Sequence, residues 1–186
     1  MDIELFKTYA FKDQFTVSAE ESMDIFSLEK EELTYGEAIW SSIDQILKFI
    51  NPDKDMVFYD LGCGTGRVCF FANIKYHLKA YGIDLLPTFI NNAEKIKNKF
   101  SLEDVHFIKN NWLNFDFSNA DIIYVAGTCL NDETLSELTN KLKSIKKNTY
   151  VISVSNELKS EDLSLVKSMY LPFSWGRANV FISIKN

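Results

Sequence analysis

The chain has 186 residues, of which 46% are hydrophobic and 14% aromatic, so it can bury a core and does not have the composition of a disordered chain. Its length fits a single domain, and no apolar run approaches the roughly 20 residues that a membrane-spanning helix needs, so we expect no membrane partner. The start carries no secretory signal pattern, and the three cysteines show neither metal-ligand spacing nor a disulfide framework, which favours a reducing, cytoplasmic setting without a metal site.

The net charge of −6 is concentrated near the beginning of the chain. Residues 1–37 hold ten acidic residues and three lysines, whereas the other 149 residues hold sixteen acidic and seventeen basic ones. We therefore expect an acidic N-terminal extension, residues 1–36, and a folded domain, residues 37–186. The extension is either a solvated acidic face or a surface that attracts a basic partner, and its charge would repel the phosphates of a nucleic acid.

Helical and strand patterns alternate along the chain. In chain order we expect a loop or short helix over 27–32, a helix over 37–50, a strand over 56–60, a helix over 66–76, a strand over 80–84, a helix from 87 to 100, strands over 105–108 and 122–125, a helix from 131 or 132 to 145, a strand over 149–154, a short helix near 161–169, and strands over 170–175 and 178–184. The core positions expected in the helices over 66–76 and 87–100 are Val68, Phe71, Ile74, Phe89, Ala93, Ile96 and Phe100.

This order predicts an α/β fold with a seven-stranded, mostly parallel sheet. The strands are apolar on both faces, which is typical of a parallel sheet covered by helices on both sides. The last two strands are joined only by Trp175-Gly176-Arg177, so we expect them to form an antiparallel hairpin at the C-terminal end.

A glycine-rich turn follows the first strand. Asp60 ends the apolar run, and Gly62, Gly64 and Gly66 follow at alternate positions before a helical pattern begins. Glycines at a strand-to-helix turn let the backbone turn sharply and approach a nucleotide-like ligand closely. The spacing differs from the Gly-x-Gly-x-x-Gly of dinucleotide-binding folds, and no Gly-Lys-Ser/Thr sequence for a nucleoside triphosphate is present.

A second acidic residue ends the next strand. Asp84 follows Asp60 by 24 residues and can accept hydrogen bonds from both hydroxyls of a ribose, or it can cap the following helix. The glycine-rich turn and this carboxylate together resemble the cofactor motifs of the seven-stranded, class I S-adenosylmethionine-dependent methyltransferases. The resemblance implies a single Rossmann-like methyltransferase domain, with S-adenosyl-L-methionine as cofactor and S-adenosyl-L-homocysteine as product.

The same resemblance assigns further residues to the cofactor. Asp60 would organise the loop and help hold the positively charged methionine end, and Leu85 would contact the cofactor beside Asp84. After the third strand, Asn111 would contact the adenine amine. Trp112 would pack its flat ring on the adenine, or it could equally be a core residue.

A narrower resemblance covers residues 34–135. Thr34-Tyr35-Gly36-Glu37 resembles the Tyr-Gly-Glu-Thr loop of the non-SET histone lysine methyltransferases, the disruptor-of-telomeric-silencing type. The runs over 59–68 and 81–84 and the closing segment over 174–180 are also similar to that family's motifs. This resemblance implies that Tyr35 closes over the methionine end, while Glu37 binds the cofactor's ammonium group or caps the first helix of the domain.

The loop after the fourth strand, residues 126–130, lies where such enzymes carry chemistry. Tyr124 and Thr128, together with Tyr35, are the residues that we expect to act at the acceptor, and Cys129 is a further candidate for touching it. No Asp/Asn-Pro-Pro-aromatic segment is present, which argues against a nucleobase acceptor. The aromatic residues expected to wall the acceptor channel are Tyr35, Trp112, Phe115, Tyr124 and Trp175.

The expected function is methyl transfer from S-adenosylmethionine to a lysine side chain of a basic protein, with no nucleic acid partner. One alternative is a small-molecule methyltransferase with the same cofactor site. Another is a cofactor-binding protein without activity, because Ala126 and Gly127 stand where the narrower family has paired asparagines. Neither histidine, His77 or His106, is expected in the site, and the sequence leaves the oligomeric state and the identity of the acceptor open.

Overall fold

The computed structural model describes residues 1–10, 12–25 and 35–186, and the segment expected over 27–32 lies outside these ranges. Within them, seven strands form one sheet in the order β3-β2-β1-β4-β5-β7-β6. The strands are β1 (Val57–Leu61), β2 (Lys79–Asp84), β3 (Val105–Lys109), β4 (Ile122–Ala126), β5 (Tyr150–Val154), β6 (Leu163–Phe173) and β7 (Gly176–Lys185).

The pairing pattern confirms the predicted α/β class. Strands β1 to β5 pair in parallel, and β7 pairs antiparallel with both β5 and β6. The direction of the chain therefore reverses only in the closing hairpin, as predicted from the absence of a helix between the last two strands. The strand order also reverses direction at β1, and this places the carboxyl ends of β1 and β4 beside a topological switch point, where ligands bind in open α/β sheets.

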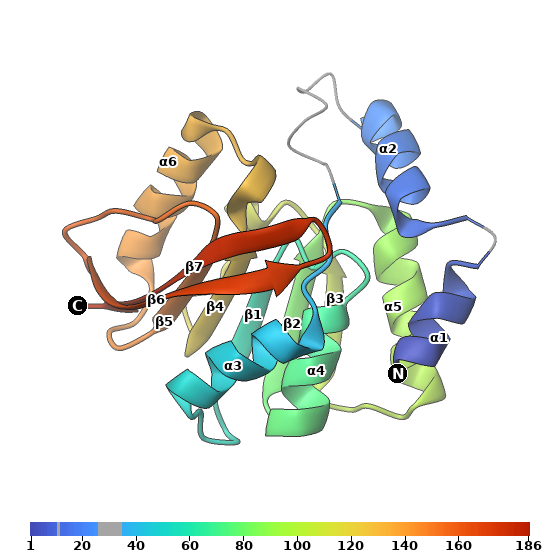
Figure 1. Cartoon of the computed structure of the whole chain (residues 1–186), viewed down its shortest axis with the longest axis horizontal. Coiled ribbons are helices and arrows are strands. Elements are labelled where there is room, and N and C mark those ends of the chain that lie inside the picture. Colours follow the sequence, from blue (N-terminus) through green and yellow to red (C-terminus); the bar gives the residue numbers. More distant parts are fainter. Residues whose placement is uncertain (11, 26–34) are drawn as a thin grey trace.

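Helices cover both faces of the sheet (Figure 1). The α-helices are α1 (Asp2–Thr8), α2 (Gln14–Ile25), α3 (Trp40–Ile50), α4 (Arg67–Tyr76), α5 (Pro87–Lys99) and α6 (Asp132–Lys141), and the 3-10 turns are η1 (Trp112–Asn114), η2 (Gly127–Cys129) and η3 (Leu142–Ser144). Because side chains alternate along a strand, Phe58 and Ile122 pack into one core with α3, α4 and α5, while Tyr59 and Ile123 pack into a second core with α6.

The short helix expected near 161–169 is wrong, because this segment belongs to the long edge strand β6. A bulge explains the misleading pattern. Leu165 pairs with Ser183 and Lys167 pairs with Ile182, so Val166 is an extra residue without a direct partner. The extra residue interrupts the alternation of a strand and leaves apolar residues at Leu163, Val166 and Met169, which is a helical spacing.

Two of the expected core residues are exposed instead. Ile74 is 46% exposed because α4 is buried through its first half, around Phe70, and emerges from the core in its second half. Phe100 is 44% exposed because it lies at the C-cap of α5, one position beyond the buried helix.

The N-terminal helices lie against α5 (Figure 1). Glu4 of α1 pairs with Lys99 at 2.6 Å, and Glu21 of α2 accepts the backbone N–H of Thr88 at 3.2 Å. Tyr9 packs on Phe89 with their ring centroids 6.2 Å apart. Several acidic side chains of the extension are thereby bound to the domain. Across the described ranges, no helix is long and apolar enough to cross a bilayer.

Candidate active site

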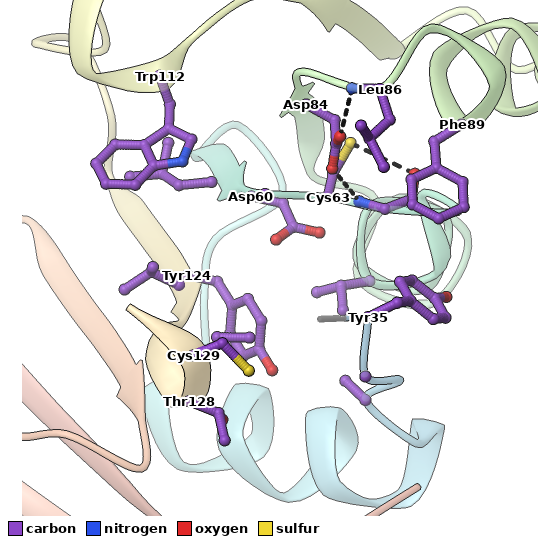
Figure 2. Close-up of a pocket in the computed structure, with 18 of the residues that line it drawn as sticks. Tyr35, Asp60, Cys63, Asp84, Leu86, Phe89, Trp112, Tyr124, Thr128 and Cys129 are labelled. Carbon is purple, nitrogen blue, oxygen red and sulfur yellow. Dashed lines mark hydrogen bonds between the residues drawn. The ribbon is translucent and has the colours of Figure 1, made fainter. Parts of the chain in front are cut away.

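A cavity of about 420 Å³ opens at the carboxyl ends of β1, β2 and β4. Its size lies within the range of small-molecule and cofactor sites. Tyr35 and Phe89 lie on one side and Trp112 on the other, with Asp60 between them (Figure 2). The predicted site residues that line it are Tyr35, Glu37, Asp60, Gly62, Gly64, Asp84, Leu85, Asn111, Trp112, Tyr124 and Thr128.

Asp84 holds the glycine-rich turn in place. One carboxylate oxygen accepts the backbone N–H of Gly64 at 2.8 Å, and the other accepts that of Leu86 at 2.9 Å (Figure 2). A carboxylate has about four lone-pair positions, so Asp84 retains acceptor capacity for a ligand that enters the cavity. Burial raises the pKa of Asp84, although these backbone N–H groups act in the opposite direction. Leu86, and not Asp84, is the N-cap of α5. Asp84 contacts the start of this helix through the hydrogen bond that it accepts from the N–H of Leu86.

The turn itself requires glycine at two positions for different reasons. Gly64 has φ +51°, and a Cβ atom there would lie 2.6 Å from the ring of Tyr35. Gly66 has φ +79°, and its Cβ would lie 2.5 Å from the ring of Phe107. Gly66 does not line the cavity, and its closest neighbours are core residues. Gly64 lines the cavity, and the absence of a side chain there lets Tyr35 approach the turn.

Tyr35 links three parts of the site. Its hydroxyl donates to Glu37 at 2.8 Å and lies 3.0 Å from the hydroxyl of Thr65. Glu37 also accepts from Arg67 at 2.9 Å, and Arg67 pairs in addition with Asp2 of α1. The Glu37 carboxylate therefore accepts two hydrogen bonds beside the cavity, and its contact with the ammonium group of the cofactor stays a prediction. It does not cap α3, whose N-cap is Ile39 without a side-chain bond, so the helix-cap alternative for Glu37 is wrong.

The segment around Tyr35 also docks on the closing hairpin. Glu37 N–H donates to the hydroxyl of Ser174 at 2.8 Å, and Ser174 N–H donates to the Glu37 carbonyl at 3.0 Å. Gly36 lies so close to Trp175 that a Cβ atom there would be 2.5 Å from the indole. The β6–β7 turn thus fixes the segment that closes one side of the cavity.

Asp60 is the least supported carboxylate of the site. It is 2% exposed, and among the residues that the structure describes its carboxylate accepts one hydrogen bond, from the Cys69 thiol at 3.8 Å. Burial, reinforced by the charge of Asp84, raises the pKa of Asp60 to about 8. A carboxyl group in this environment is mostly protonated at neutral pH.

Asn111 and Trp112 form the wall after β3. The side-chain oxygen of Asn111 accepts the N–H of Leu113 at 2.9 Å and caps η1. Trp112 is 8% exposed, packs into the core under α6 and also lines the cavity. Trp112 is therefore a core residue that also borders the cavity, and its packing on an adenine stays a prediction.

The side of the cavity opposite Asp84 is built by β4, η2 and the hairpin turn. Tyr124 lies directly across from Asp60 in the sheet register, and its hydroxyl has no partner among the described residues. The Thr128 hydroxyl lies 2.8 Å from that of Ser155. Trp175 stacks on Phe173 at 4.7 Å between ring centroids and remains 38% exposed, so this side of the cavity has an accessible edge.

The sequence belongs to a family that accounts for this arrangement. The family described as "Methyltransferase domain" matches residues 52–171, well over half of the chain. The chain belongs to this methyltransferase family. The matched region runs from the end of α3 into β6 and contains the glycine-rich turn, Asp84 and the β4 loop.

One curated relative and two solved structures refine the comparison. The H3 lysine-79 specific histone-lysine N-methyltransferase of Chaetomium globosum is 25% identical over 134 residues, and the chain spans only 26% of its length while the match covers 64% of the chain. An RNA methyltransferase from Salinibacter ruber in complex with S-adenosyl-L-homocysteine has a TM-score of 0.68 at 21% identity, covering 80% of this chain and 92% of that one. The magnesium protoporphyrin IX methyltransferase of Synechocystis PCC 6803 with bound S-adenosylmethionine has a TM-score of 0.63 at 10% identity, covering 79% of each chain.

Some cavity residues of this methyltransferase were not expected from its sequence. Ser18 of α2 lines the cavity, and no pattern in the extension pointed to it. Phe89 was expected only as a core residue, yet it faces the cavity beside Tyr35, with their ring centroids 5.1 Å apart. Arg67, which contacts Glu37, was also not expected in the cavity. Its position directly after the glycine-rich turn is the sequence feature that could have indicated this contact.

Phe115 and both histidines lie outside the cavity of the methyltransferase, whereas Cys129 lines it. Phe115 does not line the cavity, because the cap at Asn111 turns η1 so that Trp112 faces inward while Phe115 packs near Tyr59. His77 is the C-cap of α4, and His106 stacks on Tyr81 in the sheet. Cys129 lines the cavity and is partly exposed.

Proposed function

We propose that the chain transfers a methyl group from S-adenosylmethionine to a lysine side chain of a protein. The cofactor is the one predicted from the sequence, and the family match and the cofactor-bound methyltransferases of the same fold support it. The lysine acceptor is supported by the likeness to the Chaetomium globosum histone-lysine methyltransferase, which is the observation that carries this part of the proposal.

The cavity fits the cofactor chemically. S-adenosylmethionine supplies a methyl group on a positively charged sulfur. Asp84 has acceptor capacity for a ribose, Trp112 offers a flat apolar wall for an adenine, and Gly62 and Gly64 let the backbone approach the ligand. The acidic side chains of Asp84 and Glu37, together with the protonated Asp60, which can ionise beside a cation, outnumber the single guanidinium of Arg67 among the described lining residues and favour a cationic ligand.

The acceptor side provides positioning and exclusion of water. A lysine amine has a pKa near 10.4 in water and must be neutral to react, and an apolar wall favours the neutral form. Tyr124, Trp175 and Leu130 supply that wall, and Thr128 lies beside it. Alignment of the amine with the methyl group, in a cavity that Tyr35 walls on one side, then supplies much of the reduction in the barrier.

A small-molecule acceptor is the second candidate, because one feature of the structure favours it. Ser18 of α2 lines the cavity, and Tyr9 and Val17 pack with Leu86 and Phe89 next to it, so the N-terminal helices form part of the wall. A wall of this kind resembles the lids that small-molecule enzymes carry.

Incubation with methyl-labelled S-adenosylmethionine distinguishes the two candidates. The purified chain is mixed with a cell extract, and with core histones in a parallel reaction. Labelled protein that resists base and nuclease and yields methyl-lysine on hydrolysis is the expected result, and the Asp84→Ala variant is the control with weakened cofactor binding. Label confined to the small-molecule fraction would replace the protein acceptor with a metabolite. Absence of label in both fractions, despite measured cofactor binding, would contradict methyl transfer.

A further inference from the structure

The described lining of the cavity contains one place where opposite charges are adjacent. Arg67, the first residue of α4, donates from Nη1 to the Glu37 carboxylate at 2.9 Å. Asp60 and Asp84, the other acidic lining residues, have no ion pair with a basic side chain in the described part of the chain. Within the described lining, Arg67 is therefore the one cationic side chain that can meet an anionic group of a ligand.

Asp2 of α1 holds the other arm of the Arg67 guanidinium. Its carboxylate accepts from Nη2. In an arginine side chain, Nη2–H and Nε–H point to the same side and form a fork that fits both oxygens of one carboxylate. Asp2 uses only Nη2, and the Nε atom of Arg67 is buried without an acceptor among the described residues. This fork therefore already binds a carboxylate and leaves one of its donors unsatisfied.

The cofactor carries charges that match this pair of side chains. S-adenosylmethionine ends in an amino acid group, whose ammonium and carboxylate share one carbon atom, and this carboxylate is the only anionic group of the molecule. A carboxylate that leaves water needs charged or N–H partners, and a guanidinium fork is a strong one. Arg67 and Glu37 offer a cation and an anion side by side, so charge complementarity favours the amino acid end at this pair, with its carboxylate on Arg67.

Two carboxylates already share the single positive charge of Arg67, so a third one adds repulsion and favours the departure of one of them. The Glu37 side chain is 17% exposed and also accepts from the Tyr35 hydroxyl at 2.8 Å. The Asp2 side chain is 50% exposed, and Arg67 is its one ion-pair partner among the described residues. Exposed ion pairs contribute little free energy, so Asp2 is the carboxylate that yields.

We propose that Arg67 binds the carboxylate of the cofactor, and that Asp2 occupies this position in the free protein until the cofactor displaces it. The inference rests on the cofactor of the proposed function. Leu5 is buried, and Glu4 pairs with Lys99 at 2.6 Å, so α1 stays docked while only the Asp2 side chain turns to solvent. Arg67 thus selects ligands that carry a carboxylate, and Asp2 is an internal competitor that lowers their affinity.

Isothermal titration calorimetry of the full wild-type chain tests the first half of the proposal. The two ligands are S-adenosylmethionine and decarboxylated S-adenosylmethionine, which keeps the sulfonium and the amine and lacks only the carboxylate. We expect the decarboxylated ligand to bind at least about tenfold more weakly, as for the loss of a hydrogen bond between charged groups. Equal affinities would overturn the proposal and leave the cofactor site in place. Failure of both ligands to bind would overturn the cofactor assignment as well.

Two matched variants of α1 test the exchange with Asp2. Asp2→Asn removes the competing charge, so it should raise the affinity for S-adenosylmethionine about two- to fivefold and leave that for the decarboxylated ligand unchanged. Glu4→Gln removes the other ion pair of α1 and does not touch Arg67, so it should change neither affinity. An equal gain for both ligands, no gain with Asp2→Asn, or the same gain with Glu4→Gln would overturn the exchange.

Arg67→Gln locates the carboxylate contact. It should bind the two ligands with nearly equal affinity, and in the double variant with Asp2→Asn the gain from the latter change should disappear. A loss of affinity that is the same for both ligands would show that Arg67 only supports the structure of the cavity, and would overturn the assignment. The wild-type and α1 measurements keep the proposal testable even where Arg67→Gln does not fold, because they leave the contact between Arg67 and Glu37 intact.

Discussion

The substitution Asp60→Asn should stabilise the ligand-free protein. Asp60 is 2% exposed, and no N–H group of the described residues donates to it, so burial and the charge of Asp84 raise the pKa of its carboxyl group to about 8 in the native state. In the unfolded chain the same group ionises at its ordinary pKa near 3.8. Between these values the native state binds more protons than the unfolded state, so the free energy of unfolding falls as pH rises.

The size of the effect follows from the two pKa values of Asp60. Each pH unit between 3.8 and about 8 costs the native state about 1.4 kcal/mol, so the whole interval sets an upper limit of about 6 kcal/mol. Relaxation around a buried ion and entry of water reduce such penalties. We therefore expect Asp60→Asn to gain about 2–4 kcal/mol over the wild type at pH 8, and progressively less toward pH 4.

Thermal unfolding of the ligand-free wild type and variant, followed by circular dichroism between pH 5 and 8.5, measures this gain. For a domain of this size, about 2–4 kcal/mol corresponds to a rise in melting temperature of roughly 5–15 °C. The difference between the two proteins should widen with pH and become constant above pH 8. A difference that stays the same from pH 5 to 8.5, or that narrows as pH rises, would refute the assignment of a neutral, uncompensated Asp60.

Three further changes test the cavity. Asp84→Ala removes an acceptor for the ribose and the support of the glycine-rich turn, so calorimetry should show S-adenosylmethionine affinity lower by at least about 1 kcal/mol, and unchanged affinity would remove Asp84 from the site. Gly64→Ala adds a Cβ atom 2.6 Å from the Tyr35 ring, at a residue whose φ is +51°. The affinity for the cofactor should therefore fall at least about tenfold, and the melting temperature should drop by a few degrees. An affinity equal to that of the wild type would contradict the close packing of Gly64 and Tyr35. Cys129 is partly exposed, whereas Cys63 and Cys69 are buried and burial raises the pKa of their thiols. N-ethylmaleimide should therefore add one label to the native chain, measured by mass spectrometry, and should react more slowly when cofactor is bound. Two labels, or no protection by the cofactor, would contradict this geometry.

The architecture could be predicted from the sequence because local patterns and long-range packing agree in most of the chain. Apolar strands alternate with amphipathic helices, and the hairpin turn at residues 174–175 lacks a helix, so order and direction of the strands follow from simple rules. The prediction failed at residues 161–169, where local spacing and pairing disagree. A single bulged residue, Val166, changes the period of the pattern, and only the partner strand β7 reveals that the segment is extended.

The site could be predicted only in part, for a similar reason. Asp60, Gly64 and Asp84 lie in one short strand–turn–helix–strand unit, whose geometry follows from the sequence of that unit. Tyr35 and the residues that follow it contact three distant segments of the chain. Its hydroxyl meets Thr65, its ring meets Phe89, and the residues that follow it dock on Ser174. No local pattern encodes such contacts, so Phe89 was expected only as a core residue.

In the folded protein, several acidic side chains of the N-terminal extension contact the domain and do not face solvent alone. A net excess of acidic residues suggested a solvated face or an attraction for a basic partner. Asp2 pairs with Arg67, Glu4 with Lys99, and Glu21 accepts the N–H of Thr88, so these three side chains hold α1 and α2 on the domain. Because Arg67 also binds Glu37 at the cavity, the extension is tied to the site through a continuous set of ion pairs. Part of its negative charge therefore acts inside the molecule, which leaves fewer of its carboxylates to attract the basic protein that we propose as the acceptor.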